Sequence, residues 1–212
     1  MIDPKLEEYA ENHTSPEDEV LYELNRKTHL EVLRPNMLSG HLQGRFLQMI
    51  SEMIRPQRIL EIGTYTGYST ICLARGLKAG GTITTIDNNA ELETMIRYYI
   101  KKAGLSAATD LRIGEAADIL KTLEGPFDLA FIDADKENYL NYYSLAKEKV
   151  VSGGYILVDN VLWYGKVVEE TAAGDRETEA IKAFNEVVQQ DEEVENMLLP
   201  LRDGLMLIRK KT

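Results

Sequence analysis

The sequence has 212 residues, 44% of them hydrophobic, which suits one domain with a sizeable core. Its formal net charge of −11 disfavours nucleic acid as a partner, because such binding draws most of its affinity from neutralised phosphates. No run approaches the roughly 20 apolar residues that span a bilayer, so we expect no membrane partner. The single cysteine, Cys72, excludes an internal disulfide, and with a polar, acidic start it predicts a cytoplasmic protein.

The first part of the chain is expected to be helical. Ser15, followed by a proline and two acids, forms a helix-start pattern in which the serine is the cap. Apolar residues recur at helical spacing over residues 42–53. We predict a single domain over residues 1–212, with a helical segment at 1–55 and an α/β core at 56–212.

From residue 58 onward, short apolar runs alternate with stretches of helical periodicity. The predicted strands cover residues 58–62, 82–86, 111–113, 127–132 and 155–158. The predicted helices comprise one that ends at Leu77 and others over 92–103, 116–123, 139–151 and 181–188. A turn at Gly153-Gly154 separates a helix from a strand, and an antiparallel hairpin over 195–201 and 205–209 ends the pattern. Strands separated by helices imply a parallel sheet, whose ligands sit outside the carboxyl ends of the strands.

Acidic residues gather at those predicted strand ends. Glu61, Asp87, Asp133 and Asp159 each end or nearly end a strand. Any one of them suits a cap for the next helix, but four together indicate a binding site along one edge of the sheet.

The turn after the first strand, EIGTYTGYS, lacks the GxGxxG pattern of dinucleotide-binding folds. A carboxylate at Glu61 is unfavourable beside phosphates and suits a ligand with a cationic amine. Asp87 can accept both hydroxyls of a ribose. An amino-acid group and a ribose without phosphate describe S-adenosylmethionine (SAM), which we predict as the cofactor.

A second group of residues predicts a metal site. Asp133, Asp159 and Asn160 follow two strands expected to be adjacent, and two carboxylates with an amide oxygen favour Mg²⁺, with Ca²⁺ or Mn²⁺ as alternatives. Zinc is disfavoured because no Cys or His cluster accompanies them. Lys136 is a candidate general base; the alternative is a simple ion pair with Asp133 or Asp135.

The blocks EIGTYTGYST, FIDADKENY, LVDNVLWYG and LPLRDGL, in this order, make the chain resemble the cation-dependent O-methyltransferases related to caffeoyl-CoA and catechol O-methyltransferase. The resemblance runs from about residue 37 to residue 207. It implies the class I methyltransferase fold: a seven-stranded, mostly parallel, Rossmann-like sheet with helices on both faces and a C-terminal antiparallel hairpin.

The resemblance also assigns roles to single residues. The cofactor-binding residues that it implies are Met37, Ser39, Glu61, Gly63, Thr64, Ser69, Asp87, Ala116, Asp135 and Tyr142. The implied metal ligands are Asp133, Asp159 and Asn160, the implied catalytic residues are Lys136 and Asp133, and the implied acceptor-binding residues are Trp163 and Tyr164. For the last two, ordinary packing or a subunit contact is the alternative. Catechol-type relatives have a C-terminal acid that binds the second hydroxyl; that position falls near Met197, which cannot do so.

The implied reaction is methylation of a small vicinal dihydroxy aromatic of the catechol or caffeoyl type. One alternative is a hydroxyuridine of tRNA, which the acidic charge disfavours; another is a non-catalytic cofactor-binding protein, which has no need of Lys136 beside a metal. The apolar face carrying Phe46, Met49 and Met53, together with the resemblance, predicts a homodimer.

Overall fold

The computed structural model describes residues 4–212 and contains a seven-stranded sheet of order β3-β2-β1-β4-β5-β7-β6. The strands are β1 (Arg58–Ile62), β2 (Thr82–Asp87), β3 (Thr109–Ile113), β4 (Phe127–Ile132), β5 (Val150–Asp159), β6 (Val194–Leu199) and β7 (Leu205–Lys210). β1 to β5 pair in parallel, whereas β7 is antiparallel to both β5 and β6. The predicted fold class is confirmed, including the antiparallel hairpin at the end of the chain.

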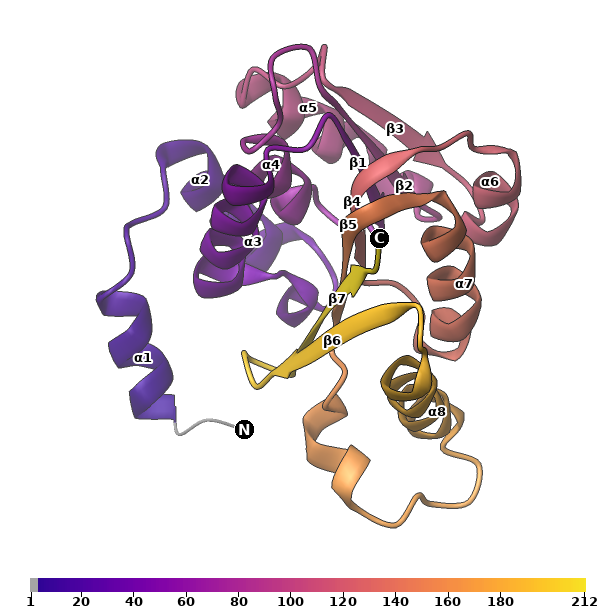
Figure 1. The fold of residues 1–212 in the computed structure, drawn as a ribbon. Helices are drawn as coiled ribbons and strands as arrows, with labels where there is room; N and C mark the ends of the chain where they lie inside the picture. Colours follow the sequence, from indigo (N-terminus) through magenta and orange to yellow (C-terminus); the bar gives the residue numbers. More distant parts are fainter. Residues whose placement is uncertain (1–3) are drawn as a thin grey trace.

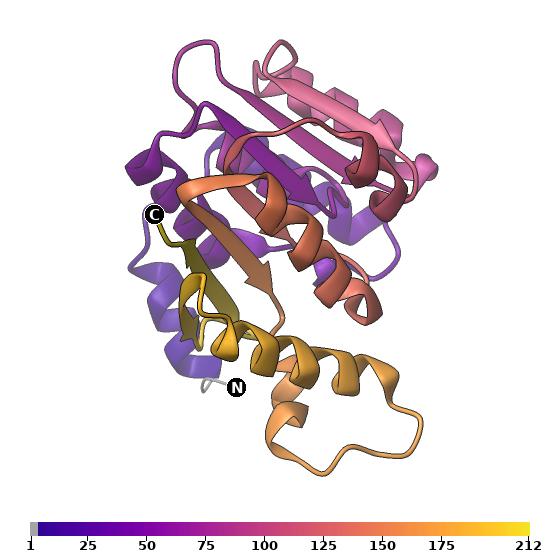
Figure 2. The same cartoon turned by 45° about the vertical axis from the view of Figure 1, so that its right-hand side comes forward.

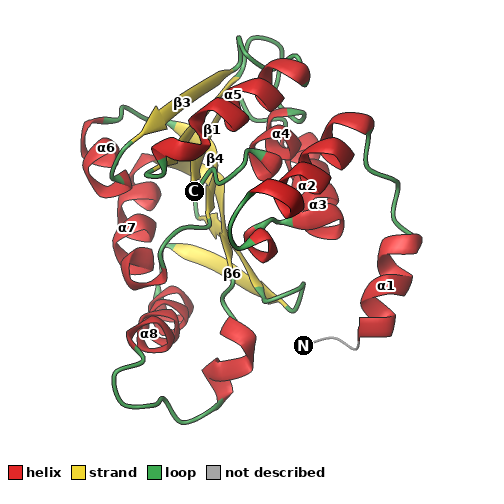
Figure 3. Cartoon of the chain, turned by 180° about the vertical axis from the view of Figure 1, so that it is seen from behind, coloured by secondary structure: helices red, strands yellow, loops and turns green. Residues whose placement is uncertain are grey.

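Helices cover both faces of this sheet (Figures 1 and 3). On one face lie α2 (Glu19–Glu31), α3 (Gly40–Ile54), α4 (Tyr68–Ala74) and α5 (Glu93–Lys102); on the other lie α6 (Ala116–Thr122), α7 (Tyr139–Lys149) and α8 (Arg176–Gln190). Figure 2 shows α7 and α8 lying across their face of the sheet. The first helix, α1 (Pro4–Asn12), stands at the periphery (Figure 1). No helix of the described residues is long and apolar enough to cross a membrane.

Alternation along the central strands divides the core between the two faces. Leu60 and Ile62 of β1 pack in the cluster beneath α6–α8, whereas Ile59 packs in the cluster beneath α2–α4. Strands covered on both sides are apolar at nearly every position, which explains the apolar run of β4 and, apart from Glu61, that of β1. Burial of both faces thereby fixes the register of the central strands.

Several predicted boundaries were wrong, among them the end of α4, which lies at Ala74, and the start of α8, which lies at Arg176. The helix expected from Ser15 begins instead at α2, where Asp18 is the cap and accepts a hydrogen bond from the Leu21 N–H at 3.0 Å. The helix expected to reach residue 151 ends at Lys149, because Val150 already pairs with β4. Gly153, with φ of 79°, lies inside β5 at an irregularity of that pairing and does not separate a helix from a strand.

Candidate active site

Four acids lie along the carboxyl edge of the sheet, as predicted. Glu61 is the second-last residue of β1, Asp87 ends β2, Asp133 follows β4 and Asp159 ends β5. Because β1 lies between β2 and β4, and β5 pairs with β4, the four acids come from four neighbouring strands. Short 3-10 helices complete this edge: η1 (Pro35–Met37), η3 (Lys136–Asn138) and η4 (Trp163–Val168).

Glu61 is fully buried, and only one of its two carboxylate oxygens has hydrogen-bond partners among the described residues. Its Oε2 accepts hydrogen bonds from Thr70 Oγ1 at 2.5 Å and Thr85 Oγ1 at 2.6 Å, while Oε1 has no hydrogen-bond partner among the described residues. Burial raises the pKa of Glu61 to about 7 against these hydrogen bonds. A buried oxygen without a donor suits a ligand that brings one, such as a protonated amine.

The turn that follows Glu61 depends on glycine. Gly63 has φ of 101°, and a Cβ there would lie 1.8 Å from the backbone oxygen of Asp133, so glycine permits the close approach of β1 and β4. The Thr64 hydroxyl is hydrogen-bonded to the Thr85 hydroxyl, with the two oxygens 2.5 Å apart, and Ser69 is buried near the start of α4. These three predicted cofactor-binding residues therefore surround Glu61 and shape the turn.

Asp87 holds the neighbouring loop with both of its oxygens. Oδ2 accepts from the Tyr65 N–H at 2.6 Å and Oδ1 from the Asn89 N–H at 2.8 Å. Each oxygen keeps a further lone pair, so the carboxylate is oriented and still able to accept from a diol.

The other predicted cofactor-binding residues occupy the surrounding segments. Met37 ends η1 with 53% of its surface exposed, and Ser39 is buried just before α3. Ala116 is the first residue of α6. Tyr142 donates to Asp135 Oδ1 at 2.6 Å, which ties α7 to the loop after β4.

Lys136 lies at the centre of the second predicted group. Its Nζ is 3.1 Å from Asp133 Oδ1 and 2.8 Å from Asn160 Oδ1, and it also donates to the Tyr139 hydroxyl at 2.5 Å. The Tyr139 hydroxyl donates onward to the backbone oxygen of Asp159 at 2.9 Å. The ion pair of Lys136 with Asp133 is therefore present, within a larger cluster.

Asp159 is the most buried acid of this cluster. Its Oδ1 accepts from the Asn160 N–H at 2.8 Å and its Oδ2 from Gln43 Nε2 at 2.6 Å. Burial, together with the charge of Asp133, raises the pKa of Asp159 to about 7. Asn160 has φ of 58°, a left-handed conformation that asparagine tolerates well.

The donor set of this cluster fits a hard divalent cation. Oxygens of Asp133 and Asn160 already converge on one cationic group, the ammonium of Lys136. Within residues 4–212, no group of three or more His, Cys, Asp or Glu side chains is placed to hold a metal, so a cation here depends on the amide oxygen of Asn160 as well as the carboxylates. An all-oxygen set of this kind favours a hard cation over zinc, which usually has Cys or His among its ligands.

Trp163 and Tyr164 lie beside this cluster in a strained segment. Both have left-handed φ values, 46° and 55°, and the Lys136 ammonium lies 5.8 Å from the centre of the Trp163 ring. Asp203, in the turn between β6 and β7, accepts from the Tyr164 N–H at 2.6 Å and holds that segment in place. Its Oδ2 is buried and has no partner among the described residues.

Four residues of the site were not identified from the sequence: Tyr139, Gln43, Arg202 and Asp203. The LPLRDGL block contains the last two but predicts only a hairpin turn. Met197, the expected position of an acid, is largely exposed on β6, whereas burial raises the pKa of Asp203, whose charge interacts with Lys136. The C-terminal acid whose charge interacts with Lys136 is therefore Asp203, six residues further along the chain than Met197.

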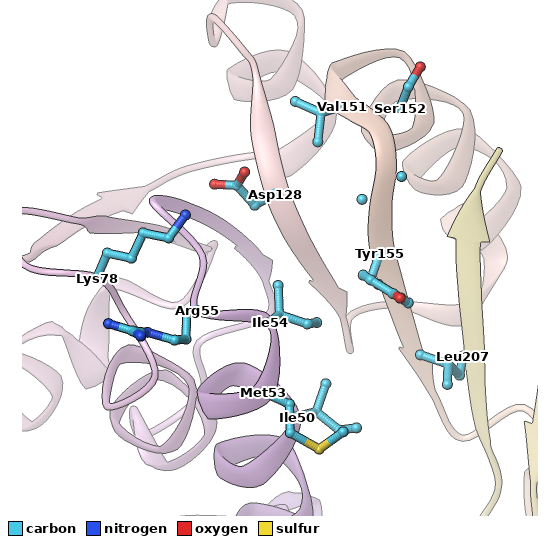
Figure 4. Close-up of a pocket in the computed structure, with 12 residues that line it drawn as sticks. Ile50, Met53, Ile54, Arg55, Lys78, Asp128, Val151, Ser152, Tyr155 and Leu207 are labelled. Carbon is cyan, nitrogen blue, oxygen red and sulfur yellow. The ribbon is translucent and has the colours of Figure 1, made fainter. Parts of the chain in front are cut away.

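A groove of about 510 Å³ lies at the opposite edge of the sheet, where the parallel strands begin (Figure 4). Apolar side chains of α3, β5 and β7 form one side, including Ile50, Met53 and Tyr155. Arg55 and Lys78 lie at the other side. None of the acids of the carboxyl edge lines this groove.

Comparison with known sequences identifies relatives over most of the chain. A family model described as O-methyltransferase matches residues 11–211. Caffeoyl-CoA O-methyltransferase 2 of Zea mays is 38% identical over 179 residues, which cover 79% of this chain and 68% of the maize protein. Probable caffeoyl-CoA O-methyltransferase 2 of Dictyostelium discoideum is 31% identical over 207 residues, covering 95% and 90%.

Solved structures match at the level of the whole fold. An O-methyltransferase from Bacillus cereus, solved in complex with SAH, superposes with a TM-score of 0.90 at 31% identity and covers 98% of this chain and 97% of its own. An O-methyltransferase from Streptomyces achromogenes involved in tomaymycin synthesis, solved in complex with SAM, gives 0.91 at 28% identity, covering 98% and 96%.

Proposed function

The chain belongs to this O-methyltransferase family, and from that premise we propose that it methylates one hydroxyl of a small vicinal dihydroxy aromatic with the help of a divalent cation. That the enzyme is a SAM-dependent O-methyltransferase follows from the family and its relatives. The class of acceptor and the cation are the proposal.

One observation carries the proposal: a lysine ammonium lies among the oxygens of Asp133 and Asn160, next to the buried carboxylate of Asp159. A proton-transferring group beside a set of hard oxygen ligands suits removal of a proton from a hydroxyl. A protein that only binds its cofactor has no use for this arrangement.

For the cofactor, we assign the amino-acid end to Glu61 and the ribose to Asp87. Glu61 Oε1 is a buried acceptor in need of a donor, and Asp87 is held by two backbone N–H groups with lone pairs to spare. Met37, Ser39, Ala116 and the other residues named above would complete the pocket. The two structural relatives solved with SAH and SAM support SAM as the cofactor.

For the cation, we assign Asp133, Asp159 and Asn160 as ligands, with Mg²⁺ favoured over Ca²⁺ or Mn²⁺. When bound, SAM supplies an electrophilic methyl group and the cation supplies Lewis-acid stabilisation of a phenolate. Three protein oxygens would fill about half of the roughly six positions that Mg²⁺ takes and would leave room for two neighbouring acceptor oxygens.

The remaining steps belong to the side chains. In its neutral amine form, Lys136 Nζ would accept the phenolic proton and become the ammonium, and the Tyr139 hydroxyl fixes the position of that nitrogen. Trp163 and Tyr164 form a wall for the aromatic ring, held by Asp203. An acceptor fixed in this way reacts faster chiefly because its oxygen is already oriented toward the methyl donor. The names of the maize and Dictyostelium relatives support an aromatic acceptor.

We also propose a homodimer. Met49 and Met53 of α3 and Met197 of β6 are largely exposed, and Met53 borders the groove of Figure 4. Exposed apolar side chains grouped on one face are typical of a subunit contact. Phe46, also expected on this face, is partly buried against the core.

The acceptor and the cation are tested together. With labelled SAM, we expect strong turnover of vicinal diphenols, much weaker turnover of the matched monophenols, loss of activity in EDTA, and recovery on adding Mg²⁺ or Mn²⁺. Equal rates on both acceptor types, undiminished by the chelator, would rule out the cation-dependent reaction while leaving the cofactor assignment intact.

A further inference from the structure

The turn of the C-terminal hairpin reaches across the edge of the sheet toward the proposed cation ligands. Arg202 has φ of 50° and donates through Nη1 to the backbone oxygens of Leu38, at 3.0 Å, and Ser39. The same nitrogen lies 3.3 Å from Gln43 Oε1. Gln43 Nε2 in turn donates to Asp159 Oδ2 at 2.6 Å. One guanidinium is therefore linked to a buried carboxylate through a single side chain.

The guanidinium decides which way the Gln43 amide points. Arginine has only donors, so the amide oxygen faces Arg202 and the amide NH₂ faces Asp159. Gln43 is 1% exposed, and a reversed amide would set its oxygen against the carboxylate and its NH₂ against the guanidinium. Mismatched buried polar groups are costly, so Arg202 keeps a donor on Asp159.

This donor completes the fixing of the Asp159 carboxylate. The Asn160 N–H holds Oδ1 and Gln43 holds Oδ2, so each oxygen has one donor and the plane of the group cannot turn freely. Both oxygens keep lone pairs toward the neighbouring cluster.

We propose that Gln43 and Arg202 are positioning residues for Asp159, with Arg202 acting through the Gln43 amide. The inference rests on the proposed cation site. Residues that orient metal ligands from outside commonly change metal affinity by 10–100-fold when they are replaced. Gln43 and Arg202 should therefore affect cation affinity although neither is a ligand.

A double-mutant cycle tests whether Arg202 acts on Asp159 through Gln43. Mg²⁺ and Mn²⁺ affinities are measured by calorimetry on the SAH-bound chain without acceptor. Gln43→Met keeps the side-chain volume and removes the donor, and we expect affinity to fall about 10-fold. Arg202→Met should also lower affinity, because the Gln43 amide oxygen loses the donor that holds it and the amide is less firmly fixed on Asp159. In the Gln43→Met background Arg202→Met should cause no further loss, since its route to Asp159 is already cut.

Matched substitutions elsewhere serve as controls. Gln48→Met changes the same residue type on the same helix, where the side chain bonds to Glu52. Arg209→Met removes a guanidinium of β7 that pairs with Glu195. Both should keep wild-type cation affinity. Arg202→Lys retains a donor-only cation and should keep more affinity than Arg202→Met.

The outcomes separate this inference from the proposed function. Unchanged affinity in Arg202→Met, or losses that multiply in the double variant, overturns the positioning role and leaves the cation site standing. A wild-type chain that binds neither Mg²⁺ nor Mn²⁺ overturns both. If Gln43→Met fails to fold, the cation affinities of Arg202→Met and Arg202→Lys still test the positioning role, because position 202 is only half-buried.

Discussion

At the scale of single residues, the site places charged side chains in a buried environment. Lys136 is 8% exposed, and its ammonium is tolerated because oxygens of Asp133, Asn160 and Tyr139 surround it. The contacts that stabilise the buried charge also hold Nζ in one place. A proton acceptor in a fixed position is more effective than the same group on a mobile side chain.

We expect Lys136→Ala to lower kcat by about 10²–10⁴, because the acceptor of the phenolic proton is lost. Affinity for SAH, measured by calorimetry, should stay near that of the wild type, since Lys136 contacts none of the proposed cofactor residues Glu61 and Asp87. Lys121→Ala, at an exposed lysine of α6 that pairs with Asp118, is the control and should leave kcat unchanged. An undiminished kcat in Lys136→Ala would remove the residue from the mechanism.

Glu61 should give the cofactor-free protein a distinctive pH dependence. Its pKa is raised from 4.5 to about 7 in the folded state, so folding favours the protonated carboxyl. The stability that Glu61 contributes is therefore present below about pH 4.5 and is lost as the pH rises toward 7, a change on the order of 3 kcal/mol.

Glu61→Gln removes this titration. The free energy of unfolding of the variant, relative to the wild type, should increase between pH 4.5 and pH 7 in denaturant titrations. Thr85→Val, which removes a donor from the same carboxyl but keeps its titration, is the comparison variant. A constant difference between Glu61→Gln and the wild type across this range would contradict the raised pKa.

At the scale of elements, helix starts show how tertiary contacts select one of several possible caps. Asp18 caps α2 and also pairs with Arg75 of the turn after α4, whereas the backbone oxygen of Ser15 accepts from His41 of α3. The segment before α2 is therefore held by α3, and the helix begins where Asp18 can serve both contacts.

We expect Asp18→Ala to lower the free energy of unfolding by about 0.5–2 kcal/mol, through loss of the cap. Asp18→Asn should lose less, because an asparagine side chain still caps the helix while the ion pair is gone. Ser15→Ala should be close to neutral. Chemical denaturation of the three variants measures this, and a larger loss at Ser15 than at Asp18 would contradict the observed start of α2.

At the scale of the whole molecule, the two edges of the sheet differ in character. The carboxyl edge gathers the four acids, whereas the amino edge carries the groove between α3 and β5. A subunit contact near the groove would leave the carboxyl edge accessible to small molecules. Assembly and catalysis would then occupy separate parts of the surface.

We expect light scattering to give a mass of twice the 24.0 kDa chain. Met53→Glu, which places a charge where 76% of an apolar side chain is exposed, should shift the mass toward that of one chain. Tyr98→Glu, at an exposed aromatic of α5, is the control and should leave the mass unchanged. A wild-type mass near 24.0 kDa would contradict the homodimer.

The sequence by itself was sufficient to predict the fold class and the placement of four acids at the ends of neighbouring strands. Parallel strands bring their carboxyl ends to one edge, so periodicity alone places Glu61, Asp87, Asp133 and Asp159 together. Local pattern was insufficient at residue 150, where helix propensity and strand pairing compete and pairing with β4 prevails. The grouping of Lys136 with Asp133, Asp159 and Asn160 was likewise predictable, because these residues follow adjacent strands, whereas Tyr139 was not identified.

Only the tertiary structure decided how the acids are held. Gln43 and Asp159 are 116 residues apart in the chain, and Arg202 and Leu38 are 164 apart. No periodicity or turn pattern connects such positions, because their contact depends on the packing of α3 and the hairpin against the same edge of the sheet. The sequence determined which chemical groups reach that edge, and the packing determined which donor each oxygen meets.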